Sequence, residues 1–282
     1  MFFEMPDHLL LAAPPPLPPL TTVSGSPRLP GKFVWADLVT DDVAAAQKFY
    51  GGLFGWTFQT SGNYTIAGNG ERPLCGMVQR PRPNKPVRPR WFGYISVSSV
   101  EKAAGKVSSL GGCVLAPPQK VPKRGEQAAF ADPEGAVFGV IKSSNGDPED
   151  FLPDVGDWIW IELLSRDARK AGEFYHEVAG YNVVENTTSA RPNDFVFVSE
   201  GYARAAALTS PKDQTRVEPN WLPFVRVNSL SQCVAQATQF GGKVVLPPNA
   251  SLFNGKLAVI ADPTGAAVGV MEWSQEAAKG GR

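Results

Sequence analysis

The chain contains an internal duplication, and this feature restricts its fold more than any other. The stretch KFVWADLVTDDVAAAQKFYGGLFGW at 32–56 matches DWIWIELLSRDARKAGEFYHEVAGY at 157–181. Near the end of each copy, ADPEGAVFGV at 131–140 returns as ADPTGAAVGV at 261–270. Because the order, spacing and type of residue all agree, the two halves are predicted to be repeated domains.

Within each copy the hydrophobic pattern changes in the same order. Alternation around Trp35 predicts a strand, and Asp41 or Asp42 then begins a helix that ends at Gly55. Three short strands follow, and the strand–helix–strands cycle then starts again. Each copy is therefore predicted as two β-α-β-β-β units of an α+β fold. The expected strands of the first copy are 33–39, 56–60, 63–67, 74–79, 91–97, 113–115, 127–131 and 136–142, and the later helices are 99–110, 167–178 and 229–240.

Composition and turn residues divide the chain into five parts. The first 20 residues, MFFEMPDHLLLAAPPPLPPL, are rich in proline and predict a disordered or loosely docked tail. We expect a cytoplasmic protein, with export as the alternative if this stretch is the remnant of a signal. The expected parts are a tail at 1–31, domains at 32–143 and 156–274, a linker at 144–155 and a C-terminal tail at 275–282.

Charge and residue content exclude several classes of function. The chain has 27 basic and 27 acidic residues, so no electrostatic footprint of a nucleic-acid partner is expected. Three cysteines without CxxC spacing and only two histidines argue against a disulfide framework or a histidine-rich metal site. The N-terminal apolar run is too short for a membrane span. A small-molecule ligand remains the expected partner, and the duplication is expected to substitute for a homodimer.

The repeated motifs carry a resemblance to a known family. A strand, then Asp-x-x-x-Ala-x-x-Phe-Tyr and a Gly-aromatic pair, then a helix ending in Gly-Gly, then Asp-Pro-x-Gly resembles the vicinal oxygen chelate superfamily. That superfamily includes glyoxalase I, extradiol dioxygenases, fosfomycin-modifying enzymes and bleomycin-binding resistance proteins. The resemblance implies paired βαβββ modules whose sheets curl into a cup in each domain, and it covers 32–143 and 156–274.

The resemblance also implies where a metal ion would be held. Members that use a metal take one ligand from the first strand, seven residues before the Asp that begins the helix, and another from the last strand. These positions are occupied by Trp35 and Gly139 in the first copy and by Trp160 and Gly269 in the second. The second modules offer Phe92 and Leu222 near the matching positions. None of these side chains provides a metal-binding lone pair, so no metal and no other cofactor is expected.

Two acidic residues remain near the lost metal positions. Asp37 and Glu162 lie two residues beyond Trp35 and Trp160, so strand alternation directs them to the same face. Each carboxylate has three interpretations: a structural partner inside the fold, a contact to a polar ligand, or a catalytic base. The tryptophans are interpreted either as core residues or as a flat binding surface.

The candidate binding residues combine bulk and space in both copies. A glycine opposite an indole leaves room for a flat ligand or for the indole itself. Enlarging either glycine is therefore expected to affect binding more than folding. The candidates are Trp35, Asp37, Trp91 and Gly139 in the first domain, with Trp160, Glu162, Trp221 and Gly269 in the second; Trp91 and Trp221 are expected at the cup rim.

Three classes of function follow from these patterns. The first is a metal-free small-molecule binding protein of the glyoxalase/bleomycin resistance type. The second is a lyase- or isomerase-type enzyme that uses Asp37 or Glu162, and the third is a structural or interaction module with filled cups. The repeated Asp-Pro-x-Gly is interpreted as a turn device, in which Asp132 and Asp262 bind nearby backbone N–H groups.

Overall fold

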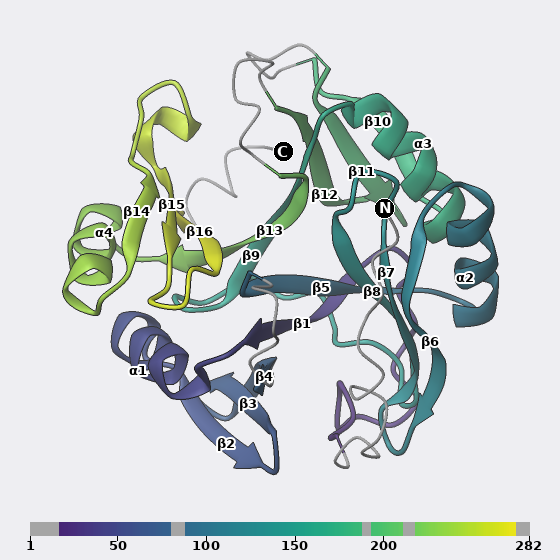
Figure 1. Cartoon of the computed structure of the whole chain (residues 1–282), viewed down its shortest axis with the longest axis horizontal. Coiled ribbons are helices and arrows are strands. Elements are labelled where there is room, and N and C mark those ends of the chain that lie inside the picture. Colours follow the sequence, from purple (N-terminus) through teal and green to yellow (C-terminus); the bar gives the residue numbers. More distant parts are fainter. Residues whose placement is uncertain (1–16, 80–87, 188–192, 211–217, 275–282) are drawn as a thin grey trace.

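The computed structural model describes residues 17–79, 88–187, 193–210 and 218–274. Within these residues the chain forms two mixed sheets, one built from β1–β8 and the other from β9–β16 (Figure 1). This confirms the α+β fold of two duplicated, cup-shaped sheets. No helix in the described part of the chain is long and apolar enough to cross a membrane.

The first sheet is built from two similar halves. Its strand order is β2-β3-β4-β1-β5-β8-β7-β6, with β1 antiparallel to β5 at the centre and each half closed by a parallel pair. Its elements are β1 (Phe33–Thr40), α1 (Val43–Phe54), β2 (Thr57–Ser61), β3 (Tyr64–Asn69), β4 (Arg72–Gln79), β5 (Arg90–Ser96), α2 (Val100–Ser109), β6 (Cys113–Val121), β7 (Gly125–Ala131) and β8 (Val137–Ser143).

The second sheet repeats this topology in the order β10-β11-β12-β9-β13-β16-β15-β14. Strand β14 is shorter than its counterpart β6, and a short 3-10 turn, η2, precedes β15. The elements are β9 (Trp158–Ser165), α3 (Ala168–Ala179), β10 (Asn182–Glu185), β11 (Phe195–Ser199), β12 (Tyr202–Thr209), β13 (Asn220–Val227), α4 (Leu230–Gln239), β14 (Lys243–Leu246), η2 (Phe253–Gly255), β15 (Leu257–Ala261) and β16 (Ala267–Glu272).

Capping residues fix the helices at the positions that the sequence predicts. Asp42 accepts a hydrogen bond from the backbone N–H of Ala45 at the start of α1, and Asp167 caps α3 in the same way. Both helices end at a glycine in the left-handed region, where φ is 73° at Gly55 and 76° at Gly180. The local sequence therefore determines where these helices begin and end.

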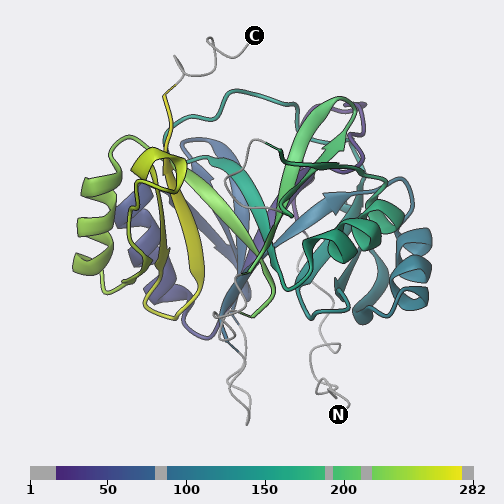
Figure 2. The same cartoon turned by 90° about the horizontal axis from the view of Figure 1, so that it is seen from above.

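The hydrophobic core lies mainly between the two domains. Helix α2 packs beside α3, and α1 beside α4, as both views show (Figures 1 and 2). One core cluster joins the second half of the first domain to the first half of the second domain, and another joins the remaining two halves. Each domain thus buries apolar surface of the other, so the two domains form one packed body.

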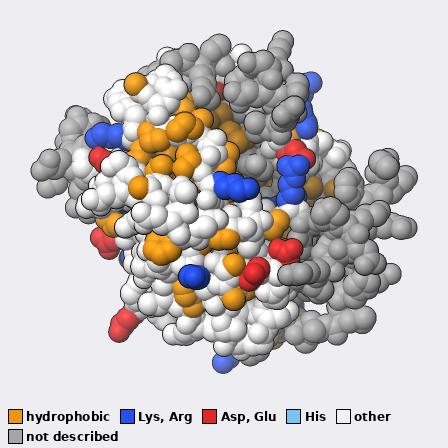
Figure 3. Space-filling model, turned by 60° about the vertical axis from the view of Figure 1, so that its left-hand side comes forward, with side chains coloured by type: hydrophobic (Ala, Val, Ile, Leu, Met, Phe, Trp, Pro, Cys, Tyr) orange, Lys and Arg blue, Asp and Glu red, His pale blue; other side chains and the backbone are white. Residues whose placement is uncertain are grey.

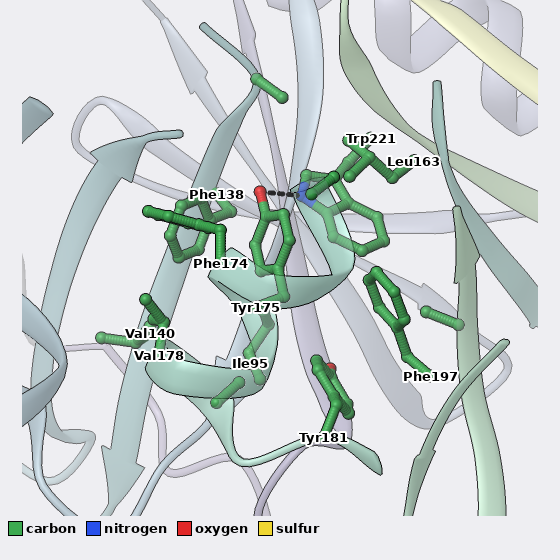
Figure 4. Packing of buried hydrophobic residues seen from close by; sticks show 14 of the residues in the cluster. Ile95, Phe138, Val140, Leu163, Phe174, Tyr175, Val178, Tyr181, Phe197 and Trp221 are labelled. Atoms are coloured by element: carbon green, nitrogen blue, oxygen red, sulfur yellow. Dashed lines mark hydrogen bonds between the residues drawn. The ribbon is translucent and has the colours of Figure 1, made fainter. Parts of the chain in front are cut away.

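Hydrogen bonds within this core connect the repeated motifs of different domains. The hydroxyl of Tyr175 donates to Asp132 Oδ2 at 3.2 Å and accepts a bond of 2.8 Å from Trp221 Nε1 (Figure 4). In the other half, Trp91 Nε1 donates to the hydroxyl of Tyr50 at 2.8 Å. The Phe-Tyr motif of one domain therefore recognises the Asp-Pro-x-Gly turn of the other.

The Asp-Pro-x-Gly turns are built as the sequence predicts. Asp132 Oδ1 accepts hydrogen bonds of 2.9 Å from the backbone N–H groups of Glu134 and Ala136. Gly135 and Gly265 have φ values of 95° and 99°, a backbone conformation that residues other than glycine rarely adopt. Glu134, at the variable position of the first turn, reaches across to accept a 2.8 Å bond from the backbone N–H of Arg166.

These turn carboxylates predict a difference between two matched variants. Burial raises the pKa of Asp132 and of Asp262. A carboxyl group whose pKa is raised in the folded state lowers stability because the unfolded chain ionises first. The cost begins as pH rises above the ordinary pKa, reaches its full size above the raised pKa, and is absent at lower pH. Asp262 Oδ2 has no hydrogen bond within 3.5 Å among the described residues, and the Tyr50 hydroxyl nearby lowers the pKa of Asp262 less than burial raises it. Asp262→Asn should therefore add about 1 kcal/mol to the free energy of unfolding at neutral pH and nothing at acidic pH.

Asp132→Asn is the matched control, because it removes the acceptor of the Tyr175 hydroxyl. We expect it to lower the free energy of unfolding by about 1 kcal/mol. Urea unfolding of both variants at neutral and acidic pH measures the difference. Equal effects of the two substitutions would contradict this account of the turns.

The segment before β1 packs against the fold over residues 17–31, where a disordered or loosely docked tail was expected. Leu17 is buried, the backbone N–H of Leu29 donates to Asp147 at 2.6 Å, and Ser199 Oγ donates to the carbonyl oxygen of Pro30 at 2.5 Å. Residues 1–16 and 275–282, where the rest of the tails was expected, lie outside the described residues. The N-terminal segment is thus held by the linker and by the second domain.

Candidate functional site

The cup of each domain is the face of the sheet that lies opposite the helices. In the first domain β1 and β5 pair so that Trp35 is opposite Tyr94 and Asp37 is opposite Phe92. Directly opposed side chains of an antiparallel pair point to the same face. We call this face the first cup. The equivalent face of the second domain, the second cup, carries Trp160, Glu162, Leu222 and Phe224.

A β-bulge lies at the same point of the central strand in both domains. The register shifts between Phe33 and Trp35, and again beside Trp160. As a result Val34 and Trp35 both pack against the apolar residues of the first cup, as Ile159 and Trp160 do in the second. Bulges redirect side chains in this way and are common beside functional sites.

Asp37 is the centre of a buried polar cluster in the first cup. Its Oδ1 atom accepts a hydrogen bond of 2.9 Å from Trp35 Nε1 and one of 2.7 Å from the Tyr64 hydroxyl. Burial, followed by the Asp37 carboxylate, raises the pKa of Tyr64 and of Tyr94 well above the usual range, so both phenols stay protonated. The carboxylate therefore serves as a hydrogen-bond acceptor for neighbouring side chains of the fold.

The first cup is filled by its own chain. Leu17 packs against Tyr64, and Leu20 packs against the cluster that contains Trp35. The guanidinium carbon of Arg124 lies 4.3 Å from the centroid of a Trp35 ring, and only 1% of the Arg124 surface is exposed. Trp35 is thereby covered on the side that would otherwise face a ligand.

The glycines of the last strands provide space for aromatic residues of the fold. A Cβ atom at Gly139 would come within 2.4 Å of the Tyr94 ring, and one at Gly269 within 2.1 Å of the Phe224 ring. These rings come from the neighbouring strands β5 and β13, which pair with the glycines in register. The space that was expected to admit a ligand is therefore filled by a ring of the fold, so enlarging either glycine is now expected to lower stability.

Trp91 and Trp221 do not lie in the cups. Trp91 pairs with Leu38 and Trp221 with Leu163, so both indoles point to the helix-facing side of their sheets. There they are 4% and 2% exposed and belong to the cores between the domains. Figure 4 shows Trp221 in its core. Their placement at the cup rim is thus corrected: each is one position out of register with the cup residues.

The second cup, in contrast, contains an open cavity of about 450 Å³. Hydrophobic side chains gather around a hollow on the face turned forward in Figure 3. Trp160 lies in the cavity wall, whereas Glu162 is 7% exposed and is not among the lining residues. The cavity is lined by Leu152, Pro153, Ile159, Trp160, Phe253, Met271 and Trp273.

Phe253 forms one wall of this cavity in an unusual conformation. It is 60% exposed, and its φ angle is 46°, in the left-handed region that bulky residues avoid. Such strain persists where the surrounding structure imposes it, and it gathers at binding sites. A large apolar ring held toward solvent at this cost is a feature of a binding surface rather than of a core.

Sequence reasoning found only Trp160 among the lining residues. Trp273 follows the last strand directly, and its aromatic type just beyond the strand that carries Gly269 was a usable signal. Leu152 and Pro153 belong to the linker, and Phe253 to the irregular turn before β15, where no periodic pattern exists. In the first cup, Arg124 was missed because it lies in the turn between β6 and β7, where no periodic pattern exists.

The residues present do not fit the metal ion that the family resemblance implies. The metal positions carry Trp35, Trp160 and the two glycines, and Asp37 Oδ1 already accepts two hydrogen bonds. Within the described residues no group of three or more His, Cys, Asp or Glu side chains is arranged to hold a metal. Nitrogen, thiolate or carboxylate ligands are what such a centre requires.

Comparison with known proteins agrees with this fold and motif pattern. Residues 32–66 match the bleomycin resistance protein-like N-terminal family, and residues 159–270 match the Glyoxalase/Bleomycin resistance protein/Dioxygenase superfamily. The Mycobacterium tuberculosis (strain CDC 1551 / Oshkosh) protein named "Putative glyoxylase CFP32" is 29% identical over 84% of this chain and 93% of its own. The anthracycline biosynthesis protein DnrV of Streptomyces peucetius is 27% identical over 86% of this chain and 94% of its own.

Solved structures share the fold at low sequence identity. The Mn(II)-bound glyoxalase from Novosphingobium aromaticivorans has a TM-score of 0.58 at 16% identity, covering 86% of this chain and 82% of that one. The 2,3-dioxygenase LapB from Pseudomonas sp. KL28 has a TM-score of 0.56 at 13% identity, covering 90% and 94%. These structures show the shared fold alone. The two family matches, together with the duplicated motifs, place the chain in the vicinal oxygen chelate superfamily, as a tandem two-domain member.

Proposed function

We propose that this protein binds a flat, largely apolar small molecule in the second cup, without a metal ion. The observation that carries the proposal is the open cavity of about 450 Å³ walled by Trp160, Trp273 and Phe253. Ligand pockets for small molecules have volumes of roughly 300–1,000 Å³ and mainly apolar walls. Aromatic walls favour a flat guest because they offer wide contact surfaces at little conformational cost.

The relatives support the same class of ligand. Two Streptomyces relatives are named as anthracycline biosynthesis proteins, and an anthracycline is a planar polycyclic aromatic compound. The cavity has the size and the aromatic walls that such a ring system requires. We therefore extend the proposal to a polycyclic aromatic ligand or one of similar shape.

The two other classes of function receive less support. A lyase or isomerase that uses Asp37 or Glu162 needs the carboxylate beside the substrate, yet neither residue lines the cavity. Asp37 is also engaged by Trp35 and Tyr64. A structural module with filled cups describes the first domain but not the second. The open cavity therefore favours binding.

Phe253 provides the sharpest test, because binding and stability should change in opposite directions. Phe253→Gly removes one cavity wall and also relieves the left-handed strain at φ 46°. We expect affinity for an anthracycline aglycone to fall about tenfold, while the free energy of unfolding rises by up to ~1 kcal/mol. Quenching of tryptophan fluorescence measures the affinity, and thermal unfolding measures the stability.

Lys123→Gly is the matched control in the first domain. Lys123 lies at the equivalent position of the repeat, is exposed, and has a φ of 65°. It should gain similar stability and leave binding unchanged. Addition of a chelator should alter neither quantity in the wild-type protein. Unchanged affinity in Phe253→Gly, or loss of binding on chelation, would rule out the proposed site.

A further inference from the structure

The two cups are built on equivalent residues, yet only one is open. The second cup presents Trp160 at the wall of a cavity, whereas the first cup holds Leu17 and Leu20 against its equivalent surface. The difference comes from a segment outside the repeat, since residues 17–20 precede the first copy. The first cup is therefore a concave site with an occupant from its own chain.

The wall of the first cup contains a buried cation without an ionic partner. Arg124 is 1% exposed and forms no ion pair with any residue that the structure describes. Its Nε atom has no hydrogen-bond partner there, and its Nη1 atom donates to the carbonyl oxygen of Pro18 at 3.3 Å. A buried guanidinium is strongly stabilised by an anion that approaches its donor edge. The Pro18 carbonyl supplies only a weak, neutral acceptor in that place.

The surroundings of Arg124 define the shape of what it would accept. Its guanidinium group stacks over Trp35, and the indole Nε1 of Trp35 is already fixed by Asp37 and Tyr64. Leu17 packs in the cluster that contains Tyr64, and Leu20 packs against the cluster that contains Trp35 and Phe92. A ring system of comparable size would make these apolar contacts in their place. Aromatic surface beside an arginine suits a planar molecule with an anionic group.

We propose that the first cup is a second binding site, for a planar small molecule that carries an anionic group. In the free protein, the Leu17–Leu20 segment occupies this site, and the ligand displaces it. The ligand's anionic group pairs with Arg124, where the carbonyl oxygen of Pro18 lies in the free protein. The charge requirement distinguishes this site from the second cup.

The segment is attached in a way that allows displacement. Residues 17–20 form no strand, and within the described chain their backbone makes only the Arg124–Pro18 hydrogen bond. The first firm attachment beyond them is the carbonyl oxygen of Thr21, which accepts from Asn145 Nδ2 at 3.2 Å. Further on, Ser26 pairs with the backbone of Asn145 at 3.0 Å. The segment can thus leave at Thr21 while the rest of the N-terminal region stays in place.

The test uses two probes that share a ring system and differ in charge. 8-Anilinonaphthalene-1-sulfonate carries an anionic sulfonate, and N-phenyl-1-naphthylamine is its neutral counterpart. Calorimetric titration of the full chain with Leu17→Ser and Leu20→Ser should show one additional site for the sulfonate, or an affinity about tenfold higher than in wild type, because the competing occupant is removed. Adding Arg124→Met should abolish this gain for the sulfonate only.

A measurement on the wild-type protein covers the case in which the released variant fails to fold. The methyl NMR signals of Leu17 and Leu20 should move toward their positions in a free peptide when 8-anilinonaphthalene-1-sulfonate is added, because both side chains leave the aromatic residues of the first cup. They should not respond to the neutral probe. Phe253→Gly should leave this response intact, which separates the first cup from the proposed function of the second. Unchanged Leu17 and Leu20 methyl signals in the wild type, or a sulfonate gain that survives Arg124→Met, would overturn the proposal.

Discussion

Gly269→Leu is expected to lower the free energy of unfolding by about 3 kcal/mol or more. A Cβ atom at this position would lie 2.1 Å from the Phe224 ring, which is 1% exposed and cannot move into solvent. Gly139→Leu should have a similar effect, since its Cβ would lie 2.4 Å from the Tyr94 ring. Chemical denaturation of each variant measures the loss.

Two further variants test whether the aromatic ring is the cause. Gly105→Ala, in helix α2, is the control, because a Cβ there meets nothing within 4 Å; it should be neutral or stabilising by up to ~1 kcal/mol. Gly269→Ala should be costly in the wild type and much less costly in a Phe224→Ala background, where the ring is absent. Additive effects of Gly269→Ala and Phe224→Ala would show that the glycine serves another purpose.

Asp37→Leu should be similarly damaging, with a loss of about 2–4 kcal/mol in the free energy of unfolding. The substitution removes the acceptor that Trp35 Nε1 and the Tyr64 hydroxyl share at 2.9 and 2.7 Å. Trp35 Nε1 keeps the Tyr64 oxygen at 3.0 Å, whereas the buried Tyr64 hydroxyl loses the carboxylate to which it donates. Thermal or urea unfolding measures the total.

Conservative changes in the same cluster separate a structural role from a binding role. Asp37→Asn keeps the Oδ1 acceptor and should lose less than Asp37→Leu, whereas Tyr64→Phe removes one donor and should cost about 1 kcal/mol. Ligand binding in the second cup should persist in all three variants at a temperature where they are folded. Loss of that binding in Asp37→Asn with unchanged stability would instead identify Asp37 as a ligand contact.

The fold could be predicted because its signals are local and occur twice. Asp42 and Gly55 determine the limits of α1 through contacts within one or two turns of the chain. Alternation around Trp35 placed it on the same face as Asp37, and the structure agrees, since both lie opposite cup residues of β5. Such patterns depend on neighbours in sequence, so they can be recognised without knowledge of distant contacts.

The candidate site could be predicted only in part, because cup residues are defined by pairing between strands. Trp91 was assigned to the cup although it pairs with Leu38, and a shift of one residue moves a side chain to the opposite face. Phe253 could not be found from periodicity, because it lies in the irregular turn before β15. The linker residue Leu152 likewise enters the cavity wall from a segment with no pattern.

The sequence by itself determined the duplication, the βαβββ modules, the turn built by Asp132, and the absence of metal-binding side chains at Trp35 and Gly139. Tertiary structure alone decided that Tyr94 fills the space beside Gly139 and that Leu17 closes the first cup while the second stays open. Residue type and spacing specify hydrogen bonds and faces within a single element. Which ring or chain segment occupies a void depends on groups brought together from distant parts of the chain, and that is settled only when the two sheets pack.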